Sequence, residues 1–326
     1  MVLASRSTGN SSTGVVILPD IKPSILDAIG NTPLVHLQRM GRDSPGRILA
    51  KVEFLNPSGS IKARSALGMI EAAERAGQLK PGSIVVEATS GNQGIGIAMV
   101  AAVKGYRSVV VMPENMSEER QKFMRAYGAE IRLVPAGTNI QEAIQSCLEE
   151  VRHMAAEDPR VWVADQFNNP ANPEVHRRTT AQEILRQVDG PIDAFVAGVG
   201  TGGTLTGVGE VLKEHFPEVK IVAVEPAKAA ILSGGPIEHH MQQGIGDGLI
   251  PSILNRDIID EIVVVTDEDA MDTARRLARE EGLFVGVSSG ANVWASLEIA
   301  RRLGKDVTVV TVLPDGGDRY LSTGIF

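Results

Sequence analysis

The sequence has little of several features that mark particular classes of protein. Its 326 residues include a single cysteine, Cys147, so no disulfide can form within the chain. Cys147 falls in a helical pattern, where we expect it to be a small core residue. A chain without internal disulfides is typical of a reducing compartment, and we predict a cytoplasmic protein.

Long apolar runs and clusters of positive charge are also missing. No run approaches the roughly 20 apolar residues of a membrane span, so we expect no membrane segment. The formal net charge is −8, and Lys and Arg are not gathered as nucleic-acid binding requires, so we expect no nucleic-acid partner. Residues 1–14 are rich in Ser, Thr and Gly and lack the apolar core of a signal peptide, which predicts a disordered tail.

What remains is a globular composition, 43% hydrophobic and 22% charged, in which apolar strands alternate with helices. Continuous apolar strands of this kind indicate parallel sheets covered on both faces. We predict two α/β lobes that meet near residues 165–172. The strands are expected at residues 47–54, 83–88, 108–112, 130–134, 194–199, 220–224, 262–265 and 307–313. The helices are expected at residues 65–75, 95–104, 118–127, 139–157, 205–215, 268–281 and 291–303.

One lysine, Lys62, lies where a tight polar turn meets a helix, in the stretch NPSGSIKAR at residues 56–64. The turn residues fix the backbone before the helix begins. The positive end of the helix dipole disfavours a second positive charge, so we expect the pKa of Lys62 to be lowered. A neutral amine is what a Schiff-base nucleophile needs. The alternative is an ordinary lysine that reaches solvent from the start of a helix.

A glycine turn, GVGTGGT at residues 198–204, follows one predicted strand and opens a helix. Backbone N–H groups can converge on an anion there, and the helix N-terminus adds partial positive charge, so we predict a phosphate site. The same turn matches G-x-G-x-x-G, and Glu225 ends the next strand, where it could reach a ribose hydroxyl. A dinucleotide site, and hence a nicotinamide-binding oxidoreductase, therefore remains an alternative.

Two further loops have the same position after a strand and before a helix. The loop TSGNQG at residues 89–94 can bind a second anion, for which a substrate carboxylate is the best candidate. Asn92 could meet a phenolic or carbonyl oxygen, although Ser90 or Asn92 could instead cap a helix. The loop GVSSGA at residues 286–291 alone indicates no more than a serine cap.

An amine that could form an imine, a phosphate site and a second anion loop together suggest pyridoxal 5'-phosphate (PLP) as the cofactor. Over nearly its whole length the chain resembles the cysteine synthase family, the O-acetylserine sulfhydrylases of PLP fold type II. Residues 37–41 and the ending at residues 317–326 resemble most the bacterial B-type isozyme. The matching stretches are residues 29–35, 56–62, 87–92, 166–170, 198–204, 243–246 and 317–323.

The resemblance implies a role for each matching residue. Lys62 would hold PLP and act in catalysis, Asn92 would contact the ring hydroxyl, and Ser288 the pyridine nitrogen. The residues that would hold the phosphate are Gly200, Thr201, Gly202, Gly203 and Thr204. Those that would bind the substrate are Thr89, Ser90, Gly91, Asn92, Gln93 and Gln166, with Gly246 at the entrance. No metal is expected.

The resemblance also implies a fold, an assembly and a reaction. We expect two doubly wound α/β domains with mostly parallel sheets: a large PLP-binding domain of residues 1–54 and 166–326, and a small mobile domain of residues 55–165. The partners would be a second copy of the chain and a serine acetyltransferase. The expected enzyme, a transferase of amino-acid biosynthesis, makes L-cysteine from O-acetyl-L-serine and sulfide through an α-aminoacrylate intermediate.

The sequence departs from the family at Gln93, where threonine is usual, and at Ala63, where aspartate is frequent. Gln93 borders the expected substrate carboxylate, so the donor and the nucleophile stay open. O-phosphoserine sulfhydrylase, cystathionine β-synthase and cyanoalanine synthase are alternatives within the same chemistry. A non-catalytic binding protein that keeps the fold is an alternative of another class.

Overall fold

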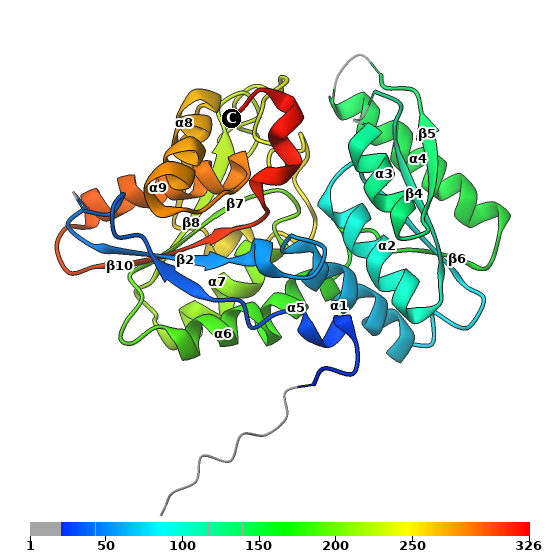
Figure 1. Cartoon of the computed structure of the whole chain (residues 1–326), viewed down its shortest axis with the longest axis horizontal. Coiled ribbons are helices and arrows are strands. Elements are labelled where there is room, and N and C mark those ends of the chain that lie inside the picture. The colour runs from blue at the N-terminus through cyan, green and yellow to red at the C-terminus, as the bar shows by residue number, and fades with distance from the viewer. Residues whose placement is uncertain (1–20, 43, 116–117, 138–139) are drawn as a thin grey trace, which may run out of the picture.

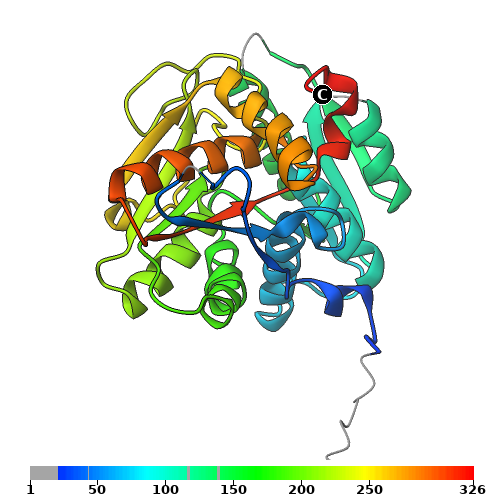
Figure 2. The ribbon, with the colours of Figure 1, turned by 60° about the vertical axis from the view of Figure 1, so that its left-hand side comes forward.

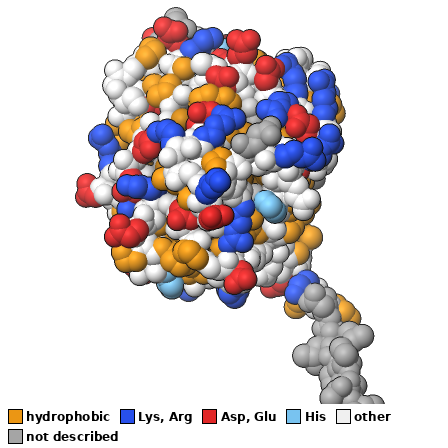
Figure 3. Space-filling model, turned by 90° about the vertical axis from the view of Figure 1, so that its left-hand side faces the viewer, with side chains coloured by type: hydrophobic (Ala, Val, Ile, Leu, Met, Phe, Trp, Pro, Cys, Tyr) orange, Lys and Arg blue, Asp and Glu red, His pale blue; other side chains and the backbone are white. Residues whose placement is uncertain are grey.

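The structure, a computed structural model, describes residues 21–42, 44–115, 118–137 and 140–326. The tail predicted to be disordered, residues 1–14, and Asn139, the expected start of a helix, lie outside the described residues. Within the described part of the chain, each helix is too short or too polar to cross a membrane. On the face shown in Figure 3, acidic and basic side chains are intermixed over much of the surface.

The strands form two separate sheets, which lie on opposite sides of the view in Figure 1. All neighbouring strands are parallel except the edge pair β1–β2. The larger sheet has the order β1 (Leu34–His36), β2 (Arg47–Val52), β10 (Thr308–Leu313), β7 (Ala194–Gly198), β8 (Lys220–Pro226) and β9 (Glu261–Val265). The smaller has the order β5 (Glu130–Val134), β4 (Arg107–Pro113), β3 (Ile84–Ala88) and β6 (Val161–Val163). The predicted α/β class with mostly parallel sheets is confirmed.

Helices cover both faces of the larger sheet, as Figures 1 and 2 show. Val222 of β8 packs in the cluster that includes α8 (Asp267–Arg276) and α9 (Val287–Leu303). Its neighbour Ile221 packs in the opposite cluster, which includes α6 (Thr180–Gln187) and α7 (Gly203–His215). Successive strand residues point to opposite faces, so a continuous apolar strand serves two cores.

The smaller sheet has the same arrangement. Val85 of β3 packs with α1 (Lys62–Arg75) and α2 (Asn92–Lys104), and its neighbour Val86 packs with α4 (Ile140–Glu157). Helix α3 (Glu118–Ala126) joins the group around Met112. The expected core position of Cys147 is confirmed, because this residue of α4 is buried in the same cluster as the residues of β3.

The strands of the smaller sheet all lie between residues 84 and 163, and those of the larger sheet lie outside that range. This division agrees with the expected small domain of residues 55–165. The bounds of the two domains, and the mobility of the smaller one, stay predictions.

Several element boundaries differ from the predicted ones. Helices α1, α2 and α9 begin three or four residues earlier than predicted, at Lys62, Asn92 and Val287. The prediction missed β6, which has only three residues, and α6, and it missed α5 (Ala171–Arg178) because residues 165–173 are polar and contain two prolines. Strand β2 ends two residues earlier than predicted, and the chain continues as a 3-10 turn, η2 (Glu53–Leu55). The helix predicted at residues 268–281 is α8 followed by a π-helical turn, η4 (Leu277–Glu281). Short 3-10 turns are η1 (Ile25–Ala28), η3 (Arg256–Ile258) and η5 (Gly317–Thr323).

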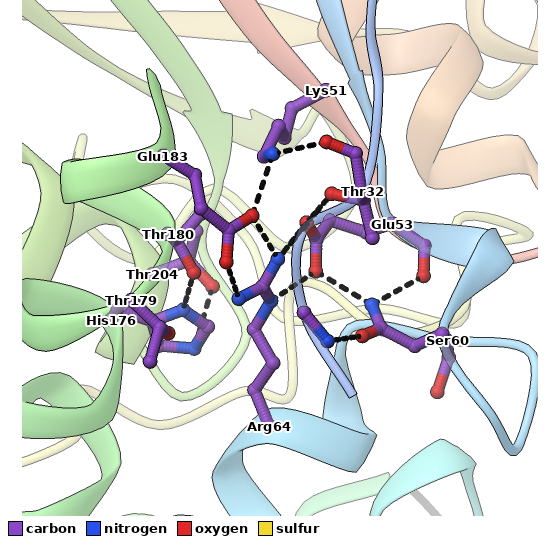
Figure 4. A network of polar contacts seen from close by, with 12 residues as sticks. Thr32, Lys51, Glu53, Ser60, Arg64, His176, Thr179, Thr180, Glu183 and Thr204 are labelled. Carbon is purple, nitrogen blue, oxygen red and sulfur yellow. Dashed lines mark hydrogen bonds and ion pairs between the residues drawn. The ribbon is translucent and has the colours of Figure 1, made fainter. Parts of the chain in front are cut away.

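A buried ion network fixes α1 to the larger sheet (Figure 4). The side chain of Arg64 is 1% exposed, and its guanidinium lies 2.7 Å from a carboxylate oxygen of Glu53 and 2.7 Å from one of Glu183. Lys51 Nζ lies 2.7 Å from the other oxygen of Glu183, and Thr32 donates to Glu53. Burial alone would raise the pKa of Glu183, but its hydrogen bonds and ion pairs with Arg64 and Lys51 hold it at about 2.

We predict that Arg64→Ala lowers the free energy of unfolding by about 3–5 kcal/mol, because it leaves two buried carboxylates without their shared partner. Equilibrium unfolding in urea measures this loss. The matched control is Arg107→Ala, which removes an arginine from an exposed pair with Glu130 and is expected to change stability little. Equal losses in the two variants would contradict a structural role for the network.

Candidate active site

The predicted site residues come together in one cavity of about 500 Å³ that both lobes line. The cavity lies at the carboxyl ends of strands, where ligands bind in open α/β sheets. Among the described residues, Gly246 is the predicted site residue that does not line it; its neighbours Ile245 and Asp247 do. The predicted residues in the lining are Lys62, Thr89, Ser90, Gly91, Asn92, Gln93, Gln166, Gly200, Thr201, Gly202, Gly203, Thr204 and Ser288.

Lys62 is the first residue of α1, and its side chain lines the cavity. No other described residue forms a hydrogen bond or ion pair with its amine. Burial lowers the pKa of Lys62, and the more distant carboxylates of Asp247, Asp315 and Glu87 only partly oppose this. The predicted direction is confirmed, but the main cause is burial and not the helix dipole. The site therefore holds an unpaired amine that loses its proton more readily than an exposed lysine does.

The glycine turn leaves a helix N-terminus open to the cavity. The N-cap of α7 is Gly202, with φ of 78°, which has no side chain to cap the helix, and the N–H of Gly203 makes only a long hydrogen bond of 3.4 Å to the hydroxyl of Thr201. A Cβ at residue 200 would lie 2.4 Å from the carbonyl oxygen of Gly244, and one at residue 203 would lie 2.2 Å from Asn172 Oδ1. The glycines are thus required by close neighbours in the protein as well as by any ligand. The free N–H groups need an acceptor, and a phosphate can supply it.

A histidine that the sequence analysis missed contacts this turn. His176 Nε2 lies 3.3 Å from the hydroxyl of Thr204, and its Nδ1 lies 2.9 Å from the hydroxyl of Thr180 (Figure 4). Burial, with the nearby charges of Arg64 and Lys62, lowers the pKa of His176 well below its ordinary value. The imidazole is therefore neutral, and it fixes the side chain of Thr204 at the mouth of the helix.

The residue on which the dinucleotide alternative depended is already occupied. Glu225 is buried, and its carboxylate accepts hydrogen bonds from the backbone N–H groups of Leu232 and Ser233, at 2.8 and 3.0 Å, and from the Ser233 hydroxyl. These contacts leave no place for a ribose hydroxyl. The expectation that Glu225 could bind ribose is wrong.

The loop at residues 89–94 continues directly into α2. The N-cap is Gly91, and no described side chain caps the helix, so the alternative that Ser90 or Asn92 is a cap is wrong. Asn92 Nδ2 donates to Asp315 Oδ2 at 2.7 Å. Arg120 of α3 donates to the carbonyl oxygen of Ser90 at 3.2 Å and to the side chain of Gln243. The start of α2 lines the cavity, and the second anion site expected there stays a prediction.

Two glutamines at this part of the site are buried: Gln93, which belongs to the loop, and Gln166. Gln93 is 2% exposed; its Oε1 accepts from Ser65 Oγ at 2.7 Å, and its Nε2 is buried with no partner among the described residues. The backbone N–H of Gln166 donates to Glu87 Oε2 at 3.2 Å. A buried donor without an acceptor is costly, and a bound carboxylate would remove that cost.

Ser288 is the second residue of α9 and is 3% exposed at the cavity wall. The N-cap of this helix is Gly286, so the alternative that Ser288 caps a helix is wrong. The expected contact between Ser288 and the pyridine nitrogen stays a prediction.

Glu87 is a buried carboxylate behind the site, and the sequence analysis gave it no role. It accepts backbone hydrogen bonds from Ala88 at 3.0 Å and Gln166 at 3.2 Å. Burial raises its pKa to about 8, although these hydrogen bonds and Lys62 lower it and Asp165 adds to the rise. The signal in the sequence was a single acid in an otherwise apolar strand, IVVEA.

Because the pKa of Glu87 is about 8 when folded and about 4.5 when unfolded, the folded protein binds the extra proton between these values. Stability should therefore fall as the pH rises through this window. We predict a flatter decline for Glu87→Gln. Urea unfolding at a series of pH values from 5 to about 8 measures the difference between the two proteins. Parallel curves for the two proteins would show that Glu87 does not carry this dependence.

Taken together, these residues fit PLP: an unpaired amine at Lys62, an uncapped helix N-terminus for a phosphate, and the side chains of Asn92 and Ser288 at the cavity wall between them. The amine supplies the covalent anchor that this aldehyde requires. The open N-terminus of α7 supplies N–H donors of the kind that phosphate groups bind.

Comparisons with known proteins agree with this fit. The family model for pyridoxal-phosphate dependent enzymes matches residues 25–315. Cysteine synthase of Staphylococcus aureus (strain Mu50 / ATCC 700699) is 50% identical over 304 residues, which are 93% of this chain and 96% of that protein. The crystal structure of cysteine synthase from Entamoeba histolytica is 39% identical, with a TM-score of 0.90 over 100% of this chain and 94% of that chain.

A third relative, O-ureido-L-serine synthase, has a crystal structure that is 46% identical to this chain, with a TM-score of 0.87 over 94% of this chain and 95% of that chain. The resemblance to the cysteine synthases that the sequence motifs indicated is confirmed. The match of the family model along most of the chain shows that this protein belongs to the pyridoxal-phosphate dependent enzymes.

Proposed function

We propose that the protein makes L-cysteine from O-acetyl-L-serine and sulfide. The observation that carries this proposal is the unpaired, buried amine of Lys62, which lies in one cavity with two helix N-termini that have glycine N-caps. The 50% identity to a cysteine synthase over nearly the whole chain supports it. When bound, PLP supplies an electron sink for the carbon from which a proton is removed.

Lys62 has two roles in this proposal. It would anchor the cofactor, and its amine would remove the proton from the donor's α-carbon. Burial lowers the pKa of Lys62, so the amine can take a proton and later return it at the same carbon. Overall, the donor would lose acetate from its β-carbon and gain sulfide at the same carbon.

The remaining residues bind and orient. The turn from Gly200 to Thr204 holds the cofactor phosphate, and the loop from Thr89 to Gln93, with Gln166, holds the donor carboxylate. Ser288 offers a neutral hydroxyl to the pyridine nitrogen, so the ring is a weaker electron sink than it would be beside a carboxylate. A moderate sink suffices for loss of a good leaving group. Gly246 acts on the entrance indirectly, because its carbonyl oxygen is hydrogen-bonded to the ring of His240.

The proposal also specifies which donor and which nucleophile the enzyme uses. By its name, the related O-ureido-L-serine synthase makes a different β-substituted serine, so the fold alone does not fix the nucleophile. Arg120 is an arginine at the cavity wall, but its guanidinium is already engaged by Ser90 and Gln243. Both acceptors are neutral, so Arg120 keeps its positive charge at the cavity wall, and the proposal of an acetyl donor depends on the relatives and not on this residue.

The direct test assays O-acetylserine and O-phosphoserine side by side, each with sulfide, homocysteine and cyanide. We predict the highest kcat/KM for O-acetylserine with sulfide. A preference for O-phosphoserine, or for homocysteine or cyanide, would replace the proposed reaction by one of its alternatives. Cofactor binding without turnover of any pair would indicate a non-catalytic binding protein.

Gln93 offers a test of donor binding. We predict that Gln93→Leu, which has a similar shape but no amide, raises KM for the donor about tenfold, because a hydrogen bond to a charged carboxylate is lost. The KM for sulfide should not change. The matched control is Ser65→Ala, which removes the partner of Gln93 Oε1 and leaves Nε2 in place. Equal donor KM values in Gln93→Leu and the parent protein would show that the amide does not reach the substrate.

The assembly and location that the resemblance implies are part of the proposal. We propose a homodimer in the cytoplasm, with a small domain that closes over the donor, and a serine acetyltransferase as a further partner. Light scattering on the purified protein measures the mass in solution. A monomer at all concentrations would contradict the dimer.

A further inference from the structure

One short segment, Pro314 and Asp315, contacts three of the four loops of the site, those that carry Lys62, Asn92 and Ser288. It follows directly after β10, which ends at Leu313. The carbonyl oxygen of Pro314 accepts from the backbone N–H of Ile61, the residue before Lys62, at 2.8 Å. The carbonyl oxygen of Asp315 accepts from the N–H of Gly286, the N-cap of the helix that carries Ser288, at 3.1 Å. The segment therefore has a fixed backbone relative to two of the loops.

The side chain of Asp315 reaches the third loop. It is 1% exposed, and its Oδ2 accepts from Asn92 Nδ2 at 2.7 Å and from the hydroxyl of Tyr320 at 2.7 Å. Its Oδ1 is buried with no partner among the described residues. A Cβ at residue 286 would lie 2.2 Å from this oxygen, so the glycine there provides the space for the carboxylate.

This contact decides which atom of Asn92 faces the cavity. An amide can present either its oxygen or its nitrogen to a ligand, whereas an ionised carboxylate only accepts hydrogen bonds. Asn92 must therefore turn Nδ2 toward Asp315. One N–H of that nitrogen bonds to the carboxylate, and the second is free to donate to a ligand in the cavity that Asn92 lines.

The charged form of Asp315 has support on its other sides. Burial raises the pKa of this carboxyl group, and Arg319, the donors Tyr320 and Asn92, and Arg120 oppose only part of that rise. Two donors converge on a single oxygen, which is the pattern of a carboxylate acceptor.

We propose that Asp315 is a positioning residue, which holds the amide of Asn92 so that an N–H, and not the carbonyl oxygen, meets the ring hydroxyl of the cofactor. The inference rests on the proposed contact between Asn92 and that hydroxyl. A donor there favours the ionised ring oxygen. Asp315 also lines the cavity, and in this proposal it acts through Asn92.

The test replaces Asp315 by asparagine, which has nearly the same shape but can present either a donor or an acceptor to Asn92. In the protein loaded with PLP, we expect the long-wavelength absorbance band of the bound cofactor to lose intensity to the short-wavelength band. We also expect PLP to bind about tenfold more weakly, as for the loss of one charge-assisted hydrogen bond. Both quantities are measured without turnover.

The matched control is Tyr320→Phe, which removes the second donor from the same carboxylate oxygen and leaves the bond to Asn92. A purely structural role of Asp315 would give similar effects in the two variants. The positioning role predicts a spectral change in Asp315→Asn alone. Thermal unfolding of both variants without cofactor shows whether each is folded, and Asp315→Ser, smaller and also neutral, should reproduce the spectral change if Asp315→Asn is not folded.

A double-mutant cycle isolates the path through Asn92. In the background of Asn92→Ala, replacing Asp315 by asparagine should add no further spectral change. An additive change, or an unchanged spectrum in the folded single variants, would overturn the inference. If the parent protein makes no cysteine but its cofactor spectrum still responds as predicted, the proposed function fails and this inference stands.

Discussion

The placement of Lys62 depends on the buried ion pairs of Arg64, two residues further along α1. The guanidinium joins a carboxylate that follows β2, from Glu53, to one on α6, from Glu183, and thereby seats the first turn of α1 between the lobes. Such a network is costly to bury and gives stability only when all partners are present. Its effect is to hold the neighbouring amine of Lys62 in a cavity where it has no ion pair. Because the amine is buried at this position, its pKa is lowered.

The site as a whole is made of helix starts held against strand ends. Three helices, α2, α7 and α9, begin at glycine N-caps without a described side-chain cap, and each opens on the cavity. Their free N–H groups are orphan donors that ligands can satisfy. Pro314 and Asp315 tie the starts of α1, α2 and α9 to one another through Ile61, Asn92 and Gly286, so the geometry of these three loops does not depend on any single loop. The fold bears the cost of buried ionisable groups here, since Glu87, Asp315 and Lys62 all have pKa values shifted by burial.

Contiguous motifs could be predicted from the sequence, and contacts between distant segments could not. Lys62, Asn92 and Thr201 each lie in a loop between a strand and a helix, a pattern that local sequence reveals. Asp315 bonds to Asn92, 223 positions away, and nothing near either residue indicates that bond. His176 was missed because its helix, α5, lies in a polar stretch that resembles a linker. The early starts of α1, α2 and α9 were missed because their first residues are mostly polar or small and carry no apolar periodicity. Because the last of these helices was predicted to begin at residue 291, Ser288 was interpreted as a residue that caps it.

The account depends most directly on Lys62 as the covalent anchor of the cofactor. Reduction of the PLP-loaded protein with borohydride, followed by proteolysis and mass spectrometry, locates the lysine that carries the cofactor. The account predicts the added mass on the peptide with Lys62 and on no other lysine. Lys51 is the most informative comparison, because it is also buried with a lowered pKa, yet Glu183 and the carbonyl oxygen of Thr32 bind its amine. Cofactor mass on Lys51 or another lysine, with Lys62 unmodified, would contradict the central claim.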